Sequence, residues 1–174
     1  MATEGEIRPT VAERREPPSA ADERTMLRSF LDFQRATVRA KVAGLTDDEA
    51  RRHLLDSSRD LTLGGLVSHL TGVERAWFRI VLAGEAVDGI DTSHDPKGLA
   101  IGPEHGLQSL VASYEQECEA ADRAAERFDL DDEARMPGRT ETLRWIYCHM
   151  IEESARHLGH MDLLHESIDG AKGE

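Results

Sequence analysis

The sequence is short of the features that mark secreted, membrane-spanning and nucleic-acid-binding proteins. Two cysteines in 174 residues are too few for a disulfide framework, and no apolar run reaches the roughly 18 residues of a membrane-spanning helix. Positive charge is also scarce: the formal net charge is −13, which disfavours nucleic acids and anionic membrane surfaces as partners. The N-terminal stretch has no apolar segment of the signal-peptide kind. We therefore expect a cytoplasmic protein with no membrane or nucleic-acid partner.

Lysine is nearly absent as well. Of the 21 basic residues only Lys41, Lys97 and Lys172 are lysine, a bias typical of GC-rich genomes such as those of actinobacteria. The two cysteines, Cys118 and Cys148, fall in separate helical patterns and outside any nucleophile motif. Both are expected to be free thiols in a reducing compartment.

The rest of the composition is that of an ordinary globular protein. Apolar residues make up 39% and charged residues 32%, and the length fits one domain. Residues 1–20 are polar, contain three prolines and lack apolar periodicity, so we expect a flexible N-terminal tail there. The predicted folded domain spans 21–168, and 169–174 form a short C-terminal tail.

Apolar side chains recur at spacings of three and four, which is the period of an amphipathic α-helix. The pattern predicts a short helical turn at 46–55 and long helices at 22–45, 62–85, 106–128 and 142–166. Expected helix-capping residues are Ser19 with Asp22, Thr46 and Thr140, and Gly44 is an expected stop. With no strand signal, the expected fold is an all-α four-helix bundle. The Gly- and Asp-rich connection at 86–105 allows a crossover, so an up-down-down-up order and a simple meander both remain open.

The last predicted helix contains an unusual stretch, "HMIEESARHLGHMD", at residues 149–162. With His149 placed at zero on a helical wheel, Glu153 lies at about 40°, His157 at about 80° and His160 at about 20°. These residues are interleaved with the apolar stripe of the helix. Because histidine and glutamate are costly to bury without a partner, the pattern indicates that something binds them.

A metal ion is one such partner. Glu153 and His157 are neighbours four residues apart on the helix, and His69 lies inside the apolar stripe of the second long helix. Two imidazoles and one carboxylate are the donors of many zinc and non-haem iron sites. Two structural alternatives stay open: His69 as a hydrogen-bonded core residue, and the other two as an exposed neighbouring pair.

Other polar and aromatic residues have weaker functional signals. His149 and His160 could orient a ligand or shuttle protons, or be merely half-buried, and His94 with Asp95 could approach the site from the long connection. Trp77 could line a pocket, although packing is the simpler interpretation. Side chains expected on a solvated face, one of which could contact an anionic substrate, are Arg35, Arg39 and Lys41. Side chains expected to form ion pairs are Glu74, Arg79, Arg144 and Asp162.

Two segments, "GGLVSHLTGVERAWFRIVLAGE" and "HMIEESARHLGHMDLLHE", resemble the DinB-like (YfiT-like) metalloprotein superfamily. The likeness extends over about residues 17–168 and is strongest to the mini-circle protein branch of actinobacteria. It implies a four-helix bundle with a crossover between the second and third helices, hence up-down-down-up topology. It also implies a divalent metal held by His69, the residue at 153 and His157. Glu153 departs from the three-histidine pattern and resembles the mycothiol-dependent maleylpyruvate isomerase branch.

The resemblance further implies a thiol-dependent activity. Members use mycothiol or bacillithiol, and an actinobacterial source favours mycothiol as the co-substrate. The expected function is therefore a thiol S-transferase-like enzyme acting on a small electrophile, with zinc, or else nickel or iron, as cofactor. His160 and His149 would move protons in that reaction. A homodimer is expected by analogy alone. Two alternatives are a non-catalytic metal-binding stress or regulatory protein and a metal-dependent hydrolase.

Overall fold

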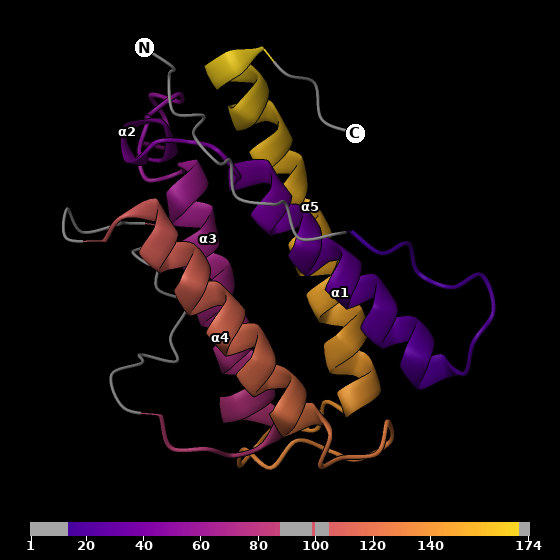
Figure 1. Cartoon of the computed structure of the whole chain (residues 1–174). Coiled ribbons are helices and arrows are strands. Elements are labelled where there is room, and N and C mark those ends of the chain that lie inside the picture. Colours follow the sequence, from indigo (N-terminus) through magenta and orange to yellow (C-terminus); the bar gives the residue numbers. More distant parts are fainter. Residues whose placement is uncertain (1–13, 88–98, 100–104, 171–174) are drawn as a thin grey trace, which may run out of the picture.

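The computed structural model describes residues 14–87, 99 and 105–170, and within these ranges the regular structure is entirely helical. The prediction of an all-α protein is thus confirmed. One isolated bridge joins Glu133 and Thr142, and no helix of the described part is long and apolar enough to cross a membrane. The helices are α1 (Glu23–Val42), α2 (Asp47–Ala50), α3 (Leu63–Glu74), the π-helical η1 (Arg75–Leu82), α4 (Leu107–Ala125) and α5 (Leu143–Asp169). Figure 1 labels the five α-helices.

The predicted starts of α1 and α5 are right to within one residue, but the expected N-caps, Ser19 and Thr140, lie three and two residues too early. The N-cap of α1 is Asp22, whose side chain accepts a 3.0 Å hydrogen bond from the amide of Thr25; Ser19 lies outside the helix. The N-cap of α5 is Thr142, whose hydroxyl accepts from the amide of Trp145 at 3.3 Å, and Thr140 precedes it. In each case the cap is the polar side chain directly before the first helical turn, since only there can it reach a free amide.

The second long helix changes form part of the way along. It is α-helical from Leu63 to Glu74 and π-helical from Arg75 to Leu82. The prediction of one regular helix over 62–85 therefore has the right extent, but it misses this widened segment. Gly84, at φ +66°, follows its end, a backbone conformation that glycine adopts without strain.

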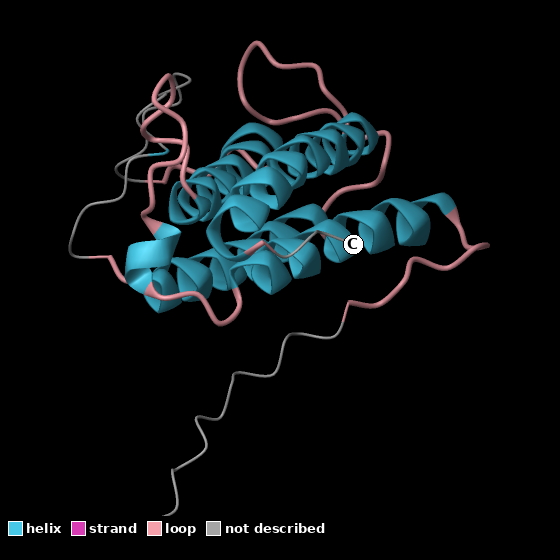
Figure 2. Cartoon of the chain, turned by 90° about the horizontal axis from the view of Figure 1, so that it is seen from above, coloured by secondary structure: helices cyan, strands magenta, loops and turns pink. Residues whose placement is uncertain are grey.

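The long helices pack as two pairs, α1 with α5 and α3 with α4 (Figures 1 and 2). Helices α1 and α5 run in the same direction, because Glu23 pairs with Arg144 near one end and Lys41 with Asp162 near the other. Helix α3 with η1 runs parallel to α4. Arg75 pairs with Glu117, and ten residues further along both segments Glu85 pairs with Arg127. Helix α3 also packs against α5.

The buried apolar side chains form two clusters along the bundle. One includes Val38, Leu66, Leu70, Tyr114 and Met161, and the other includes Leu31, Phe78, Leu82, Ala121 and Ile146. Burying one such large side chain contributes about 1.5–3 kcal/mol. The core therefore holds the helices at fixed distances, and side chains that face inward from different helices stay in contact.

Arg35 falls between these clusters and corrects one expectation. It was predicted on a solvated face, yet it is 3% exposed, because its guanidinium pairs with Glu74 at 2.7 Å and with Asp122 at 2.8 Å. Amphipathic patterning places a long basic side chain outside unless an internal carboxylate meets it. The neighbouring basic side chains, Arg39 and Lys41, pair with acids at the surface. The predicted ion-pair roles of Glu74, Arg79, Arg144 and Asp162 are confirmed.

Candidate functional site

Three side chains of the metal-ligand type meet between α3 and α5. His69 comes from the second turn of α3, whose first turn is fixed by Thr62: its hydroxyl accepts a 3.0 Å hydrogen bond from Gly65. Glu153 and His157 stand one turn apart on α5 and are each 7% exposed. We call His69, Glu153 and His157 the donor cluster.

One carboxylate oxygen is shared by both imidazoles of the donor cluster. Oε1 of Glu153 lies 3.3 Å from Nε2 of His69 and 3.0 Å from Nε2 of His157. One ligand atom from each residue lies within 4.8 Å of the others, and the two imidazole rings are 4.7 Å apart between centroids. The three residues predicted from the sequence are therefore brought together in space.

Glu153 is an ionised carboxylate. The hydrogen bond with His157, and then that with His69, holds its pKa well below the usual range, although burial acts in the opposite direction. Arg156, one turn away on α5, also contacts its second oxygen, Oε2. A buried negative charge facing two imidazole nitrogens is an environment that attracts a cation.

The donor cluster fits a divalent metal by its chemistry. Two imidazole nitrogens and one carboxylate oxygen are the donors of open zinc and non-haem iron sites, which leave coordination positions for a substrate. The side chain of His69 is 27% exposed, so the cluster is reachable from one side. A small molecule could therefore approach the same point that the three donors surround.

The two other histidines singled out on α5 lie on opposite sides of the donor cluster. Nδ1 of His160 is 3.5 Å from Nδ1 of His157, and burial, with smaller effects from His157 and Arg156, lowers the pKa of His160. His149 lies one turn before Glu153 and has aromatic neighbours instead. The structure thus associates His160, but not His149, directly with a donor.

His149 belongs to an aromatic cluster that sequence reasoning missed. Its ring stacks on Trp145 with a 5.1 Å centroid distance and a 14° interplanar angle, and it meets Trp77 edge-on at 4.5 Å. The two indoles lie 5.3 Å apart. The sequence pattern that could have predicted part of this cluster is the spacing of four residues between Trp145 and His149, which continues to Glu153. We call Trp77, Trp145 and His149 the aromatic cluster.

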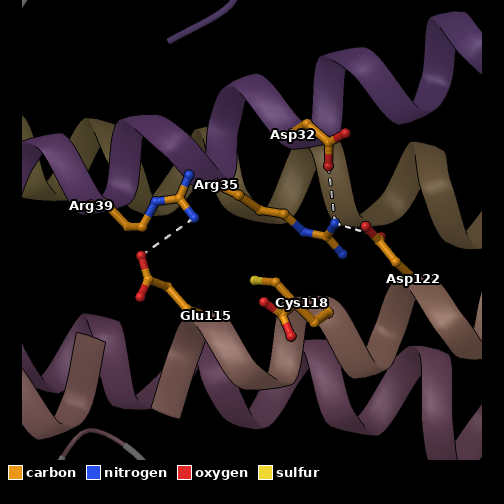
Figure 3. Close-up of a pocket in the computed structure, with 7 residues that line it drawn as sticks. Asp32, Arg35, Arg39, Glu115, Cys118 and Asp122 are labelled. Carbon is orange, nitrogen blue, oxygen red and sulfur yellow. Dashed lines mark hydrogen bonds and ion pairs between the residues drawn. The ribbon is translucent and has the colours of Figure 1, made fainter. Parts of the chain in front are cut away.

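A separate cavity of about 360 Å³ lies between α1 and α4 (Figure 3). Arg35 reaches across it from α1 toward Asp122, and Cys118 faces it from α4. Burial raises the pKa of the Cys118 thiol well above its usual range, so the sulfur stays protonated and unreactive. Both cysteines are free, Cys118 buried and Cys148 exposed, as predicted. This cavity contains no member of the donor cluster.

The proposed approach of His94 and Asp95 lies outside the described residues, as does most of the 86–105 connection. Trp77, for which a pocket role was left open, lies in η1 beside His149. Arg156 is a further neighbour that the sequence reasoning did not single out. The sequence could have predicted this contact, because Arg156 follows Glu153 by three residues and side chains with that spacing are neighbours on a helix.

An all-helical chain that gathers His, Glu and His between two helices has the features of a DinB-like protein. A family model described as mycothiol-S-transferase matches residues 26–170. The chain belongs to the mycothiol-S-transferase family, and the predicted DinB-like resemblance is confirmed. No curated protein matches the chain.

Proposed function

We propose that this protein is a metal-dependent thiol S-transferase that joins mycothiol to a small electrophile. The observation that carries the proposal is the donor cluster, in which three ligand atoms lie within 4.8 Å of one another in a chain of the mycothiol-S-transferase family. His69, Glu153 and His157 would hold the metal, with zinc as the first expectation and nickel or iron as alternatives.

The chain's own residues would prepare the thiol. Glu153, already ionised, supplies one negative charge, while the imidazoles of His69 and His157 complete the donor set without adding charge. With a divalent ion held by these three residues, the pKa of a coordinating thiol would be lowered, which would favour the nucleophilic thiolate. The exposed edge of His69 leaves a path by which thiol and electrophile reach that point.

His160 is proposed to handle the proton. In the transfer, the S–C bond forms as the bond between carbon and its leaving group breaks. The thiol proton passes to the imidazole of His160 and from there to the leaving group, so the overall change releases one protonated leaving group. The position of His160, half-buried and 3.5 Å from His157, supports this role. His149, the other histidine predicted to be catalytic, has aromatic neighbours.

We also infer that the chain is an up-down-down-up four-helix bundle. The support is the pattern of ion pairs, which makes α1 parallel to α5 and α3 parallel to α4. The donor cluster and the aromatic cluster add that α3 is antiparallel to α5. This order needs a crossover between the second and third long helices.

The first test is the metal content of tag-free protein, measured by elemental mass spectrometry. We expect near-stoichiometric zinc, nickel or iron in the wild-type protein and a loss in Glu153→Ala and His157→Ala. Glu152→Gln is the matched control: this neighbouring carboxylate is 64% exposed and outside the donor cluster. A wild-type protein that stays metal-free after reloading would overturn the proposal.

The second test measures turnover with a panel of electrophiles in the presence and absence of mycothiol. Thiol-dependent consumption that is lost in His160→Gln supports the S-transferase. Hydrolysis without thiol would instead indicate a metal-dependent hydrolase. Metal binding with no turnover for any substrate would indicate a non-catalytic metal-binding protein.

A further inference from the structure

The donor cluster and the aromatic cluster lie along one row of side chains. On α5, Trp145, His149, Glu153 and His157 follow one another at intervals of four residues, so their side chains form one row that rotates by about 40° per step. We call these four residues the α5 row. His69 contacts Glu153, while Trp77 contacts Trp145 and His149. Side chains of α3 and η1 therefore meet the α5 row in antiparallel order, from the donors to the indoles.

Trp145 is an exposed side chain at the end of the α5 row that lies away from the donor cluster. It is 46% exposed, one of few large hydrophobic side chains so exposed among the described residues. Its ring is held by stacking on His149 and by contact with Trp77, and Arg139 lies over Trp77 at 5.0 Å. An exposed indole whose orientation is fixed in this way offers a flat, preorganised surface for a ring.

The surroundings of Trp145 are polar. Trp145 lines a cavity of about 400 Å³ together with Thr140, Glu141 and Thr142. Two hydroxyls and a carboxylate provide both donors and acceptors of hydrogen bonds. An aromatic face beside such groups suits a ring that carries many hydroxyls, because its C–H face packs on the indole while its hydroxyls bond to the rim.

The separation of Trp145 from the donor cluster along α5 matches a thiol that carries such rings. Trp145 lies two helical turns, about 12 Å along the axis, from Glu153. Mycothiol consists of an acetylated cysteine joined by an amide to a glucosamine–inositol pseudo-disaccharide. With its sulfur at the donor cluster, the two polyhydroxylated rings of mycothiol would extend along the α5 row toward Trp145.

We propose that Trp145, supported by His149 and Trp77 and flanked by Thr140 and Glu141, binds the pseudo-disaccharide end of the thiol co-substrate. This inference rests on the proposed function and assigns a second subsite to it. The aromatic cluster selects the thiol by its sugar-like end, and the electrophile is bound beside the donor cluster.

The test compares two thiols on metal-loaded, full-length protein. Trp145→Ala is expected to raise the KM for mycothiol about tenfold, and to change the KM for N-acetylcysteine, which lacks the rings, by less than about twofold. Trp145→Phe, which keeps an aromatic ring, should recover most of the loss. Leu163→Ala is the control, since Leu163 is a 67% exposed apolar residue of α5 about five turns further along.

A second measurement does not depend on turnover. Trp77 and Trp145 are the two tryptophans of the chain, so its tryptophan fluorescence reports on the aromatic cluster alone. Free glucosaminyl-inositol, which has no sulfur, should shift this fluorescence saturably in metal-free protein and in Glu153→Ala. Trp145→Ala should abolish the saturable response.

The outcomes separate this inference from the proposed function. An active transferase in which Trp145→Ala leaves the KM for mycothiol unchanged, or raises only the KM for the electrophile, overturns the inference and keeps the function. A protein with no metal or turnover that still binds glucosaminyl-inositol through Trp145 supports the subsite while the S-transferase proposal fails. An absence of any fluorescence response to glucosaminyl-inositol overturns the subsite.

Discussion

Arg35 of α1 and Glu74 of α3 form a two-pronged ion pair inside the protein. Nε and Nη2 of Arg35 each donate a hydrogen bond of 2.7 Å to one oxygen of Glu74. Glu74 is 1% exposed, and Glu74 and Asp122 raise the pKa of Arg35 against the effect of burial. Arg35 therefore keeps its charge in the core, and the burial of its guanidinium depends on the carboxylates that meet it.

Removing one member of this pair should be more damaging than removing both. Glu74→Leu is expected to lower the free energy of unfolding by about 3–5 kcal/mol, because it leaves Arg35 buried without its main partner. The double variant Arg35→Met/Glu74→Leu should be clearly more stable than Glu74→Leu. Urea denaturation measures both, with Glu119→Ala, which removes an exposed pair with Arg123, as a control. Equal losses in the single and double variants would contradict the expectation.

Two glycines of α3 should respond oppositely to alanine. A Cβ at Gly65 would collide with the carbonyl oxygen of Leu99 and lie 2.8 Å from that of Asp60, so Gly65→Ala should lower stability by about 1–3 kcal/mol. A Cβ at Gly72 meets nothing within 4 Å, and Gly72→Ala should raise stability by about 0.5–1 kcal/mol. Thermal unfolding followed by circular dichroism compares them. A Gly65→Ala variant as stable as the wild type would contradict this expectation, since the backbone at both Leu99 and Asp60 would have to move away.

The assignment of Thr142 as the N-cap of α5 can be tested by comparing its substitution with that of Thr140. Thr142→Ala removes the hydroxyl that accepts from Trp145 and should cost about 1 kcal/mol of stability. Thr140→Ala removes a similar side chain two residues earlier, which caps no amide, and should change stability by less than about 0.5 kcal/mol. Chemical denaturation of both variants is the measurement. The reverse ranking would restore the cap expected from the sequence.

Glu85 links η1 to α4 and should make stability depend on acid pH. Hydrogen bonds from Arg79 and then Arg127 hold its pKa below the usual range. Its stabilising contribution is therefore complete above the unfolded-state pKa of about 4.3 and is lost as the pH falls through the lower folded-state pKa. The stability gap between wild type and Glu85→Gln should be constant from pH 8 to about 5 and should narrow in more acidic solution. A gap independent of pH down to acid unfolding would contradict this.

Periodicity predicted the helices and singled out the residues of the donor cluster, because both follow local rules, and the DinB-like resemblance then implied that the three residues form one metal site. His69, Glu153 and His157 could be recognised since each interrupts an apolar stripe, and a stripe marks what faces inward. Arg35 was misplaced because its burial depends on Glu74, which is 39 residues away, and no local pattern encodes that meeting. Trp145 was missed for a related reason, because its place in the aromatic cluster depends on contact with Trp77, which lies on another helix. Local periodicity predicts which face of a helix is buried. It does not predict which residues of two different helices meet, because that depends on the three-dimensional arrangement.

The π-helical form of η1 has an evolutionary consequence. A π turn is equivalent to an α-helix into which one residue has been inserted. The insertion falls after His69 and before or around Trp77, so it sets the angle of the indole and leaves the histidine untouched. A deletion of the single residue Ala76 would turn Trp77 away from Trp145 while preserving every donor. Under the proposed subsite, a change of length at this point would alter the site for the pseudo-disaccharide and leave the proposed metal ligands in place.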